Sequence, residues 1–134
     1  NIRPLRILLV DDSVQVRQEL GQLLELSGAV QIVGEAADGR EAIRLAAELY
    51  PEVIVMDLEM PGLDGCAATS QIKQHLPTTR VVMLSVHARP EDILRAQAAG
   101  VDRFVVKGAS YYVLVGAILG KEMSHNSCEK GEIS

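Results

Sequence analysis

Aromatic residues and cysteines are scarce in this chain of 134 residues. It has no tryptophan, one phenylalanine and three tyrosines, so its core must be built from aliphatic side chains. The two cysteines, Cys66 and Cys128, lie far apart and form no metal-binding or redox motif. This excludes a fold stapled by disulfides and indicates a reducing compartment, the cytoplasm. No apolar run approaches the length of a membrane span and no signal peptide is recognisable, so we expect no association with a membrane.

The chain also lacks an excess of positive charge. Thirteen Lys and Arg residues stand against 18 Asp and Glu residues, which gives a net charge of −5 at pH 7. A bare nucleic-acid-binding surface would need a basic patch, so the composition argues against one. Apolar residues make up 48% of the chain and charged residues 23%, which is typical of a globular protein. The length is sufficient for one domain with a single core.

Five short apolar runs alternate with segments of helical spacing. The runs are rich in β-branched residues and end at polar residues, which is typical of strands buried on both faces. We expect strands over 7–10, 31–36, 53–56, 81–84 and 104–106. We expect helices over 16–27, 38–50, 64–75, 90–99 and 110–119. This alternation predicts an α/β fold, namely a doubly wound, five-stranded parallel sheet with helices on both faces. Of the two common strand orders for such folds, we take the flavodoxin-like order 2-1-3-4-5.

Two segments differ in character from the rest of this pattern. The helix over 90–99 is anchored by Ile93, Ala96 and Ala99, which are mostly small, so we expect it to shift at little cost. The chain becomes polar after the last helix, and residues 121–134 are predicted to be a linker or tail that follows a domain over 1–120.

Polar residues follow four of the five predicted strands. Asp11 and Asp12 follow the first, Asp57 the third, Ser85 the fourth and Lys107 the fifth. In doubly wound sheets the site lies at the carboxyl ends of the strands, and neighbouring strands are about 4.8 Å apart. The third strand is central in the predicted order. We therefore expect an acidic pocket with a hydroxyl group and an ammonium group on its far side.

Three carboxylates at this spacing need a cation. Each pair at 4 Å repels by roughly 4 kcal/mol at an effective dielectric constant near 20. Carboxylates with no imidazole or thiolate nearby suit a hard ion, Mg²⁺ or Mn²⁺. Mg²⁺ favours sites with one or two carboxylates and phosphate oxygens, and a carboxylate can accept a phosphoryl group as an aspartyl phosphate. The pattern therefore indicates a phosphoryl group on Asp57.

Four strings at these strand ends resemble the receiver domain of two-component response regulators. The strings are LLVDDS, VIVMDLEMPGLDG, VVMLSVHARPED and AAGVDRFVVKGAS, and the resemblance covers residues 5–119. It implies that Asp57 accepts a phosphoryl group from a phosphohistidine of a sensor histidine kinase. It also implies that Asp12 binds Mg²⁺ directly and Asp11 through water, with Asp57 and the backbone carbonyl of Glu59 as further ligands.

The resemblance assigns roles to further residues around the acceptor. Ser85 and Lys107 would each bind an oxygen of the phosphoryl group. Ser85 and Phe104 would act as the switch pair, in which the ring turns inward as the hydroxyl moves toward the phosphate. The fourth helix, fifth strand and fifth helix would then present a changed face. Glu59 and His87 match positions that tune the lifetime of the phosphorylated state.

The stretch Lys-Gly-Ala-Ser resembles the LuxR-type, NarL-like subgroup of receivers. Its members usually carry a helix-turn-helix domain after the receiver. The resemblance therefore implies control of transcription, in which only such an output domain, absent from this sequence, contacts DNA. It leaves open a homodimer that forms on phosphorylation. It implies a phosphoacceptor that assists its own phosphorylation and dephosphorylation, not an enzyme.

Two positions depart from the family pattern. Phe104 stands where tyrosine is commoner, and Gly108 stands where many receivers have a proline that is preceded by a cis peptide. A cis bond before a residue other than proline costs about 2.5–4 kcal/mol, whereas glycine reaches backbone angles closed to other residues. We therefore predict a trans peptide between Lys107 and Gly108, with the ammonium of Lys107 directed at Asp57.

Other interpretations of the same residues remain open. Taken singly, Asp12 and Ser13 could cap the next helix, and the other polar residues could be solvated strand ends. A flavodoxin-type binder would need a loop rich in Gly, Ser or Thr after the first strand. A haloacid-dehalogenase-like phosphatase would carry its nucleophile on the first strand with a second Asp two residues later. An interaction module independent of phosphate would not need the Asp, Ser and Lys set.

Overall fold

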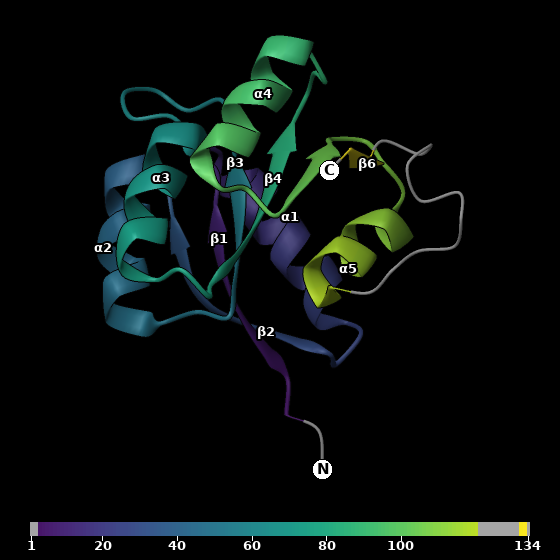
Figure 1. Cartoon of the computed structure of the whole chain (residues 1–134). Helices are drawn as coiled ribbons and strands as arrows, with labels where there is room; N and C mark the ends of the chain where they lie inside the picture. Colours follow the sequence, from purple (N-terminus) through teal and green to yellow (C-terminus); the bar gives the residue numbers. More distant parts are fainter. Residues whose placement is uncertain (1–2, 121–131, 134) are drawn as a thin grey trace.

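The computed structural model describes residues 3–120 and 132–133. Within them, strands and helices alternate along the chain as predicted (Figure 1). The strands are β1 (Leu5–Val10), β2 (Val30–Ala36), β3 (Val53–Asp57), β4 (Arg80–Ser85), β5 (Arg103–Val106) and β6 (Glu132–Ile133). The helices are α1 (Val14–Glu25), α2 (Gly39–Leu49), α3 (Gly65–His75), α4 (Pro90–Ala99) and α5 (Tyr111–Leu119). None of these helices is both long and apolar enough to cross a membrane.

All strands belong to one sheet, in the order β2-β1-β3-β4-β5-β6. The first five are parallel, which confirms the predicted order 2-1-3-4-5. The short strand β6 extends the sheet beyond the prediction, because it pairs with β5 in the antiparallel direction. It lies in the stretch 121–134 that was predicted to be a linker or tail, and the remainder of that stretch lies outside the described residues.

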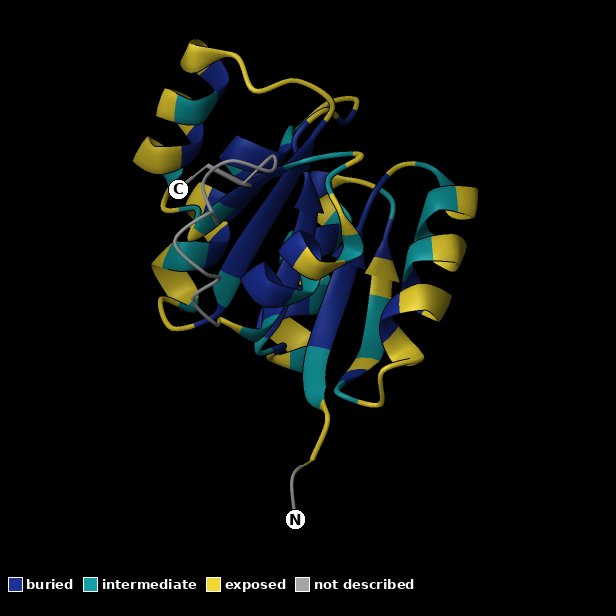
Figure 2. Cartoon of the chain, turned by 90° about the vertical axis from the view of Figure 1, so that its right-hand side faces the viewer, coloured by how far each residue is buried: buried dark blue, intermediate teal, exposed yellow. Residues whose placement is uncertain are grey.

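Two aliphatic layers enclose the sheet. Helices α2, α3 and α4 cover one face, and α1 and α5 cover the other (Figure 1). The central strand β3 is buried along its whole length, as a strand covered on both faces must be. Figure 2 shows the buried strands at the centre and exposed residues on the outer sides of the helices. The predicted aliphatic core is confirmed, and Phe104 is the one aromatic residue among the buried residues described.

Side chains that cap helices fix where most helices begin. Asp38, Asp64 and Ser110 accept hydrogen bonds from the first turns of α2, α3 and α5, at the predicted helix starts. Helix α1 ends at Glu25, before its predicted end at residue 27. The hydroxyl of Ser27 bonds the backbone at this helix end. It donates to the carbonyl of Leu24 and accepts from the N–H of Ala29.

Helix α4 is the least firmly attached helix of its face. It has no side-chain cap at its start, and its buried residues are Asp92 and Ala96. Of the two large apolar residues near its centre, Ile93 packs against the core and Leu94 is 65% exposed. A cavity of about 30 Å³ is lined by residues of the helix and by Phe104 on β5. This agrees with the prediction that little apolar contact holds α4 in place.

Glycines shape two of the loops at the carboxyl edge of the sheet. The Lys107–Gly108 peptide is trans, and Gly108 has a φ of +94°, so the predicted geometry is confirmed. Gly65 begins α3 directly behind the end of β3. A Cβ atom there would overlap the carbonyl oxygen of Asp57 and would also lie 3.0 Å from the Cα atom of Leu58. A residue other than glycine at position 65 would therefore force α3 away from the strand.

Substitution of Gly65 is expected to destabilise the protein. Gly65→Ala should lower the free energy of unfolding by about 1–3 kcal/mol, because the methyl group meets backbone that cannot rotate away. Gly21→Ala is the matched control in α1, where the nearest side-chain atom would lie 3.4 Å from the new Cβ atom. That change should be neutral or add up to about 1 kcal/mol. Urea unfolding measures both, and equal stability of the two variants would contradict the prediction.

Candidate functional site

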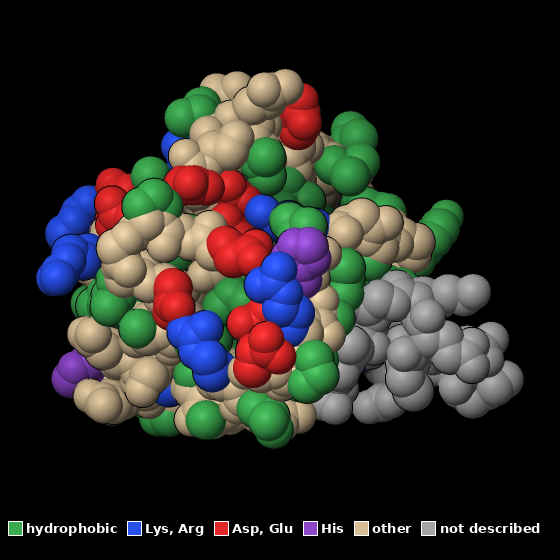
Figure 3. All heavy atoms as spheres, turned by 90° about the horizontal axis from the view of Figure 1, so that it is seen from above, with side chains coloured by type: hydrophobic (Ala, Val, Ile, Leu, Met, Phe, Trp, Pro, Cys, Tyr) green, Lys and Arg blue, Asp and Glu red, His purple; other side chains and the backbone are tan. Residues whose placement is uncertain are grey.

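Three carboxylates meet at the carboxyl edge of the sheet. The register between β1 and β3 pairs Val10 with Met56, so that Asp11 comes to lie beside Asp57. Ligand oxygens of Asp11, Asp12 and Asp57 all lie within 4.8 Å of one another. Asp11 and Asp57 are buried and Asp12 is exposed. Figure 3, which views this edge from above, shows acidic side chains gathered on it with basic side chains among them.

Lys107 joins this cluster from two strands away. The residue follows β5, and its backbone N–H donates to the carbonyl of Ser85 over 2.7 Å. Its Nζ atom lies 3.2 Å from Oδ2 of Asp11 and 3.2 Å from Oδ1 of Asp57. The prediction that the ammonium points at Asp57 is confirmed. The lysine offsets part of the repulsion between the two buried carboxylates.

Burial controls the charge of the central carboxylate. Loss of solvent raises the pKa of Asp57 from 3.8 to about 6, and the charge of Asp11 adds to this rise. Lys107 and the N–H of Glu59 act in the opposite direction, since both favour the ionised form. Burial lowers the pKa of Lys107, but the two carboxylates beside it outweigh this effect and hold that pKa above its ordinary value.

The predicted switch residues lie on β4 and β5, where Ser85 ends β4 and Phe104 is the second residue of β5. Ser85 is fully buried, and its Oγ atom accepts a hydrogen bond from the N–H of His87 over 3.2 Å. In the described part of the chain, its hydroxyl has no hydrogen bond to Asp57 or Lys107. Phe104 pairs in register with Met83 and is 2% exposed, so its ring already points inward.

The two residues predicted to tune the phosphorylated state lie at the rim of the site. Glu59 and His87 are both exposed, on the loops that follow β3 and β4. The N–H of Glu59 donates to Oδ1 of Asp57 over 3.3 Å, which places this loop against the central carboxylate. The structure thus brings Asp11, Asp12, Asp57 and Lys107 into contact, with the backbone of Glu59 against Asp57. Ser85 contacts the N–H of His87, and Phe104 is buried in the core beneath α4.

The structure adds two features that the sequence analysis missed. Arg17 of α1 donates from Nη1 to the carbonyl of Asp11 over 2.6 Å, so that a guanidinium lies beneath the acidic loop. An ion pair between Arg95 of α4 and Asp64, the cap of α3, connects the two helices. Arg17 lies six residues after Asp11, on the helix that follows the acidic loop, and no motif in the sequence marked it. The pair of Arg95 and Asp64 is 31 residues apart and left no local signal.

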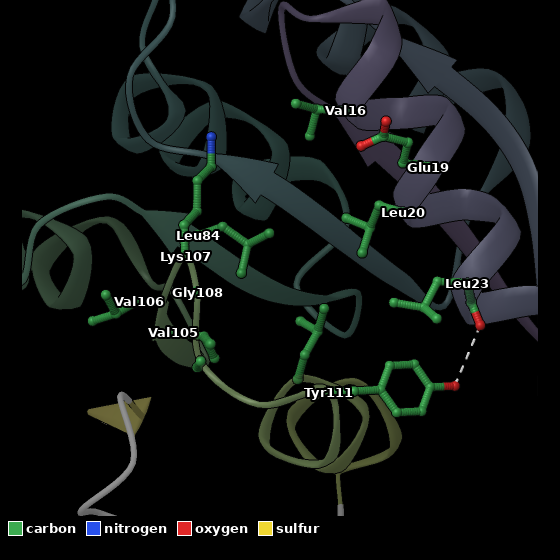
Figure 4. Close-up of a pocket in the computed structure, with 12 residues that line it drawn as sticks. Val16, Glu19, Leu20, Leu23, Leu84, Val105, Val106, Lys107, Gly108 and Tyr111 are labelled. Carbon is green, nitrogen blue, oxygen red and sulfur yellow. Dashed lines mark hydrogen bonds between the residues drawn. The ribbon is translucent and has the colours of Figure 1, made fainter.

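An apolar groove opens beside the acidic cluster, between α1 and α5 (Figure 4). It has a volume of about 370 Å³, and Leu20 and Leu23 line it from α1. Tyr111 lines it from α5, and its hydroxyl lies 3.4 Å from the carbonyl oxygen of Leu23. The aliphatic stem of Lys107 forms part of the wall, while its ammonium points to the carboxylates. The groove therefore begins where the charged site ends.

Comparison with known proteins identifies the family. The family model described as the response regulator receiver domain matches residues 7–119. The response regulator protein VraR of Staphylococcus aureus is 40% identical over 114 residues, which are 85% of this chain and 54% of VraR. The chain thus spans about half the length of the curated relatives it matches.

Solved structures agree with this match. A two-component response regulator of the LuxR family from Aurantimonas sp. SI85-9A1 has a TM-score of 0.82 and 32% identity, covering 95% of this chain and 94% of that one. CheY in the CheX–CheY–BeF3–Mg²⁺ complex from Borrelia burgdorferi has a TM-score of 0.81 and 28% identity, covering 88% and 89%. With its acidic cluster and lysine at the carboxyl edge of a parallel sheet, the chain belongs to the response regulator receiver domain family of two-component systems.

Proposed function

We propose that Asp57 receives a phosphoryl group from a phosphohistidine of a sensor histidine kinase. The observation that carries this proposal is the position of Asp57, at the centre of a carboxylate cluster with an ammonium 3.2 Å away. An oxygen of Asp57 attacks the phosphorus, an acyl phosphate O–P bond forms and the N–P bond breaks. The electron pair of that bond returns to the imidazole, which takes up a proton from solvent. Lys107 neutralises charge on the transferred group.

The chemistry of the donor set fits Mg²⁺. The clustered donors are carboxylate oxygens without imidazole or thiolate, which suits a hard cation. Asp11, Asp12 and Asp57 would hold the ion together with the backbone carbonyl of Glu59. Bound Mg²⁺ would neutralise the carboxylates and draw in the oxygens of a phosphoryl group. The Mg²⁺ named with the similar CheY of Borrelia burgdorferi supports this assignment.

Phosphorylation then acts on the face formed by α4, β5 and α5. Ser85 is the one hydroxyl residue of β4 and ends that strand beside the acceptor strand, and Phe104 of β5 lines the small cavity beside α4. Movement of Ser85 toward the phosphoryl group would alter the packing of this ring and shift α4, which has few buried side chains. Glu59 and His87, at the rim, would set how long the phosphorylated state lasts.

The output lies beyond this domain. Similarity to VraR and to a LuxR-family regulator supports control of transcription through a DNA-binding domain after residue 120, with 121–134 as linker. The altered face of α4, β5 and α5 would favour a homodimer. The domain assists its own phosphorylation and dephosphorylation, turns over no separate substrate, and acts in the cytoplasm.

Asp57 is expected to be the sole acceptor. Incubation with acetyl phosphate and Mg²⁺ should add one phosphoryl group to the intact mass, because the buried carboxylate is the nucleophile. Asp57→Asn and excess chelator should each prevent this addition. Asp64→Asn is the matched control, since that carboxylate caps α3 outside the cluster, and it should leave the addition intact. An unchanged gain of mass in Asp57→Asn would contradict the proposal.

The charge of Asp57 should depend on pH near neutrality. In the absence of divalent cations, its carboxyl carbon should titrate by NMR with a midpoint near 6, where burial places the pKa. Lys107→Met should raise that midpoint further, because the lysine favours the ionised form. Lys73→Met, which removes an ion pair with Asp102 remote from the site, should leave it unchanged. A midpoint near 3.8 in the wild type would contradict the burial argument.

The same shift predicts how stability depends on pH. A folded-state pKa above the unfolded value favours folding while Asp57 is protonated, and this contribution is lost as the pH rises through about 6. Asp57→Asn should therefore unfold at a higher temperature than the wild type above that pH. This advantage should disappear below the ordinary aspartate pKa of 3.8. Melting curves without divalent cations measure the difference, and an advantage independent of pH would speak against it.

The structural response should be concentrated around α4. Treatment with beryllofluoride and Mg²⁺ should change amide hydrogen exchange most between Val86 and Phe104, because α4 has few buried anchors there. Ser85→Ala should reduce this change, since it removes the hydroxyl that is proposed to move toward the phosphoryl group. Changes confined to α1 and α2 would refute the proposed route.

A further inference from the structure

Arg17 makes two directional contacts beneath the acidic loop. Its side chain is 12% exposed, and Nη1 donates to the carbonyl of Asp11 over 2.6 Å. Its Nε atom donates to Oε1 of Glu35 on β2 over 2.9 Å. Hydrogen bonds from a charged donor are among the stronger ones, and the planar guanidinium fixes both partners at once. The loop after β1 is thus tied to the neighbouring strand through one side chain.

The Asp11 carbonyl that Arg17 binds belongs to the peptide plane between Asp11 and Asp12. Asp11 is also held elsewhere, because its N–H donates to the carbonyl of Ala36 over 3.1 Å and its Oδ1 accepts from the N–H of Ser13 over 2.9 Å. Asp12 differs, since in the described part of the chain no hydrogen bond or ion pair holds its exposed carboxylate. The direction of the Asp12 side chain therefore depends on the orientation of that peptide plane.

We propose that Arg17 is a positioning residue for the cation site, held by Glu35, and that it acts by fixing the Asp11–Asp12 peptide so that Asp12 faces the other carboxylates. This inference rests on the proposed function, in which these carboxylates bind Mg²⁺. Lysine could not replace the arginine fully, because a single ammonium cannot reproduce the fork that contacts a carbonyl and a carboxylate together.

The direction in which removal of Arg17 changes the affinity for Mg²⁺ distinguishes a positioning role from an effect of its charge. Arg17 carries a positive charge close to the acidic loop, and its removal would by charge alone make cation binding tighter. Loss of a positioning contact would instead make binding weaker, because Asp12 would spend less time directed into the cluster. Groups that orient metal ligands typically contribute about 10–100-fold to metal affinity.

Titration with Mg²⁺ alone, without a phosphoryl donor, provides the first test. Arg17→Met keeps the apolar stem and should raise the Kd by about tenfold. Arg17→Lys should raise the Kd nearly as much, and Glu35→Gln should raise it by a smaller factor. Arg44→Met is the matched control, since Arg44 pairs with glutamates on α2 away from the site, and it should leave the Kd unchanged. An unchanged or lowered Kd in Arg17→Met would overturn the inference.

A second readout needs no metal. The N–H of Asp12 lies in the peptide plane that Arg17 holds, so its ¹⁵N order parameter should fall in metal-free Arg17→Met and stay unchanged in Arg44→Met. An order parameter equal to that of the wild type would overturn the inference even if the Kd rose. If the wild type bound no Mg²⁺, the proposed cation site would fail, and this measurement would still decide the role of Arg17. Should Arg17→Met not fold, Arg17→Lys and Glu35→Gln carry both tests.

Discussion

Repulsion between carboxylates crowded at one edge of a parallel sheet shapes both the charged site and its surroundings. Asp11 and Asp57 are both buried, and burial alone makes ionisation of Asp57 unfavourable. The ammonium of Lys107, 3.2 Å from each of them, offsets part of this cost, and the N–H of Glu59 adds to its effect on Asp57. A site with one lysine and three carboxylates keeps a negative excess, and a cation followed by an incoming phosphoryl group meets that excess with complementary charge.

The backbone around the cluster is held more firmly than the elements that would respond to it. Asp57 ends a strand that is buried along its whole length, and Gly65 lets α3 begin in contact with that strand end. Helix α4 has two buried residues and a small cavity between it and Phe104. A rigid acceptor beside a weakly anchored helix is a physical arrangement in which a local change of charge can produce a displacement elsewhere.

The acidic cluster also depends on contacts outside its own residues. Arg17 and Glu35 connect the loop after β1 to β2, and the N–H of Glu59 holds the loop after β3 against Asp57. Each contact places a backbone segment, and the backbone in turn directs a carboxylate. The apolar groove between α1 and α5 begins where these polar contacts end, so a partner that approaches Asp57 meets charge and apolar surface side by side.

The strand order 2-1-3-4-5 is one of two common orders for such sheets, and strand pairing in the structure confirmed it. The five strand segments, the helix caps at Asp38, Asp64 and Ser110, and the polar residues at the strand ends could be predicted from the sequence alone. These are local signals, because apolar period, capping residues and strand ends are all read within a few neighbouring positions. The trans peptide before Gly108 was predictable for the same reason, since it depends on one dihedral preference.

The contacts that join distant segments could not be predicted from the sequence and became visible in the folded chain. The pairing of β6 with β5, the inward position of Phe104, the bond of Arg17 to the carbonyl of Asp11 and the ion pair of Arg95 with Asp64 all depend on which elements become neighbours. The raised pKa of Asp57 belongs with them, because it follows from how much solvent the surrounding strands exclude. Such effects depend on distance in space, and the order of residues along a chain does not fix that distance.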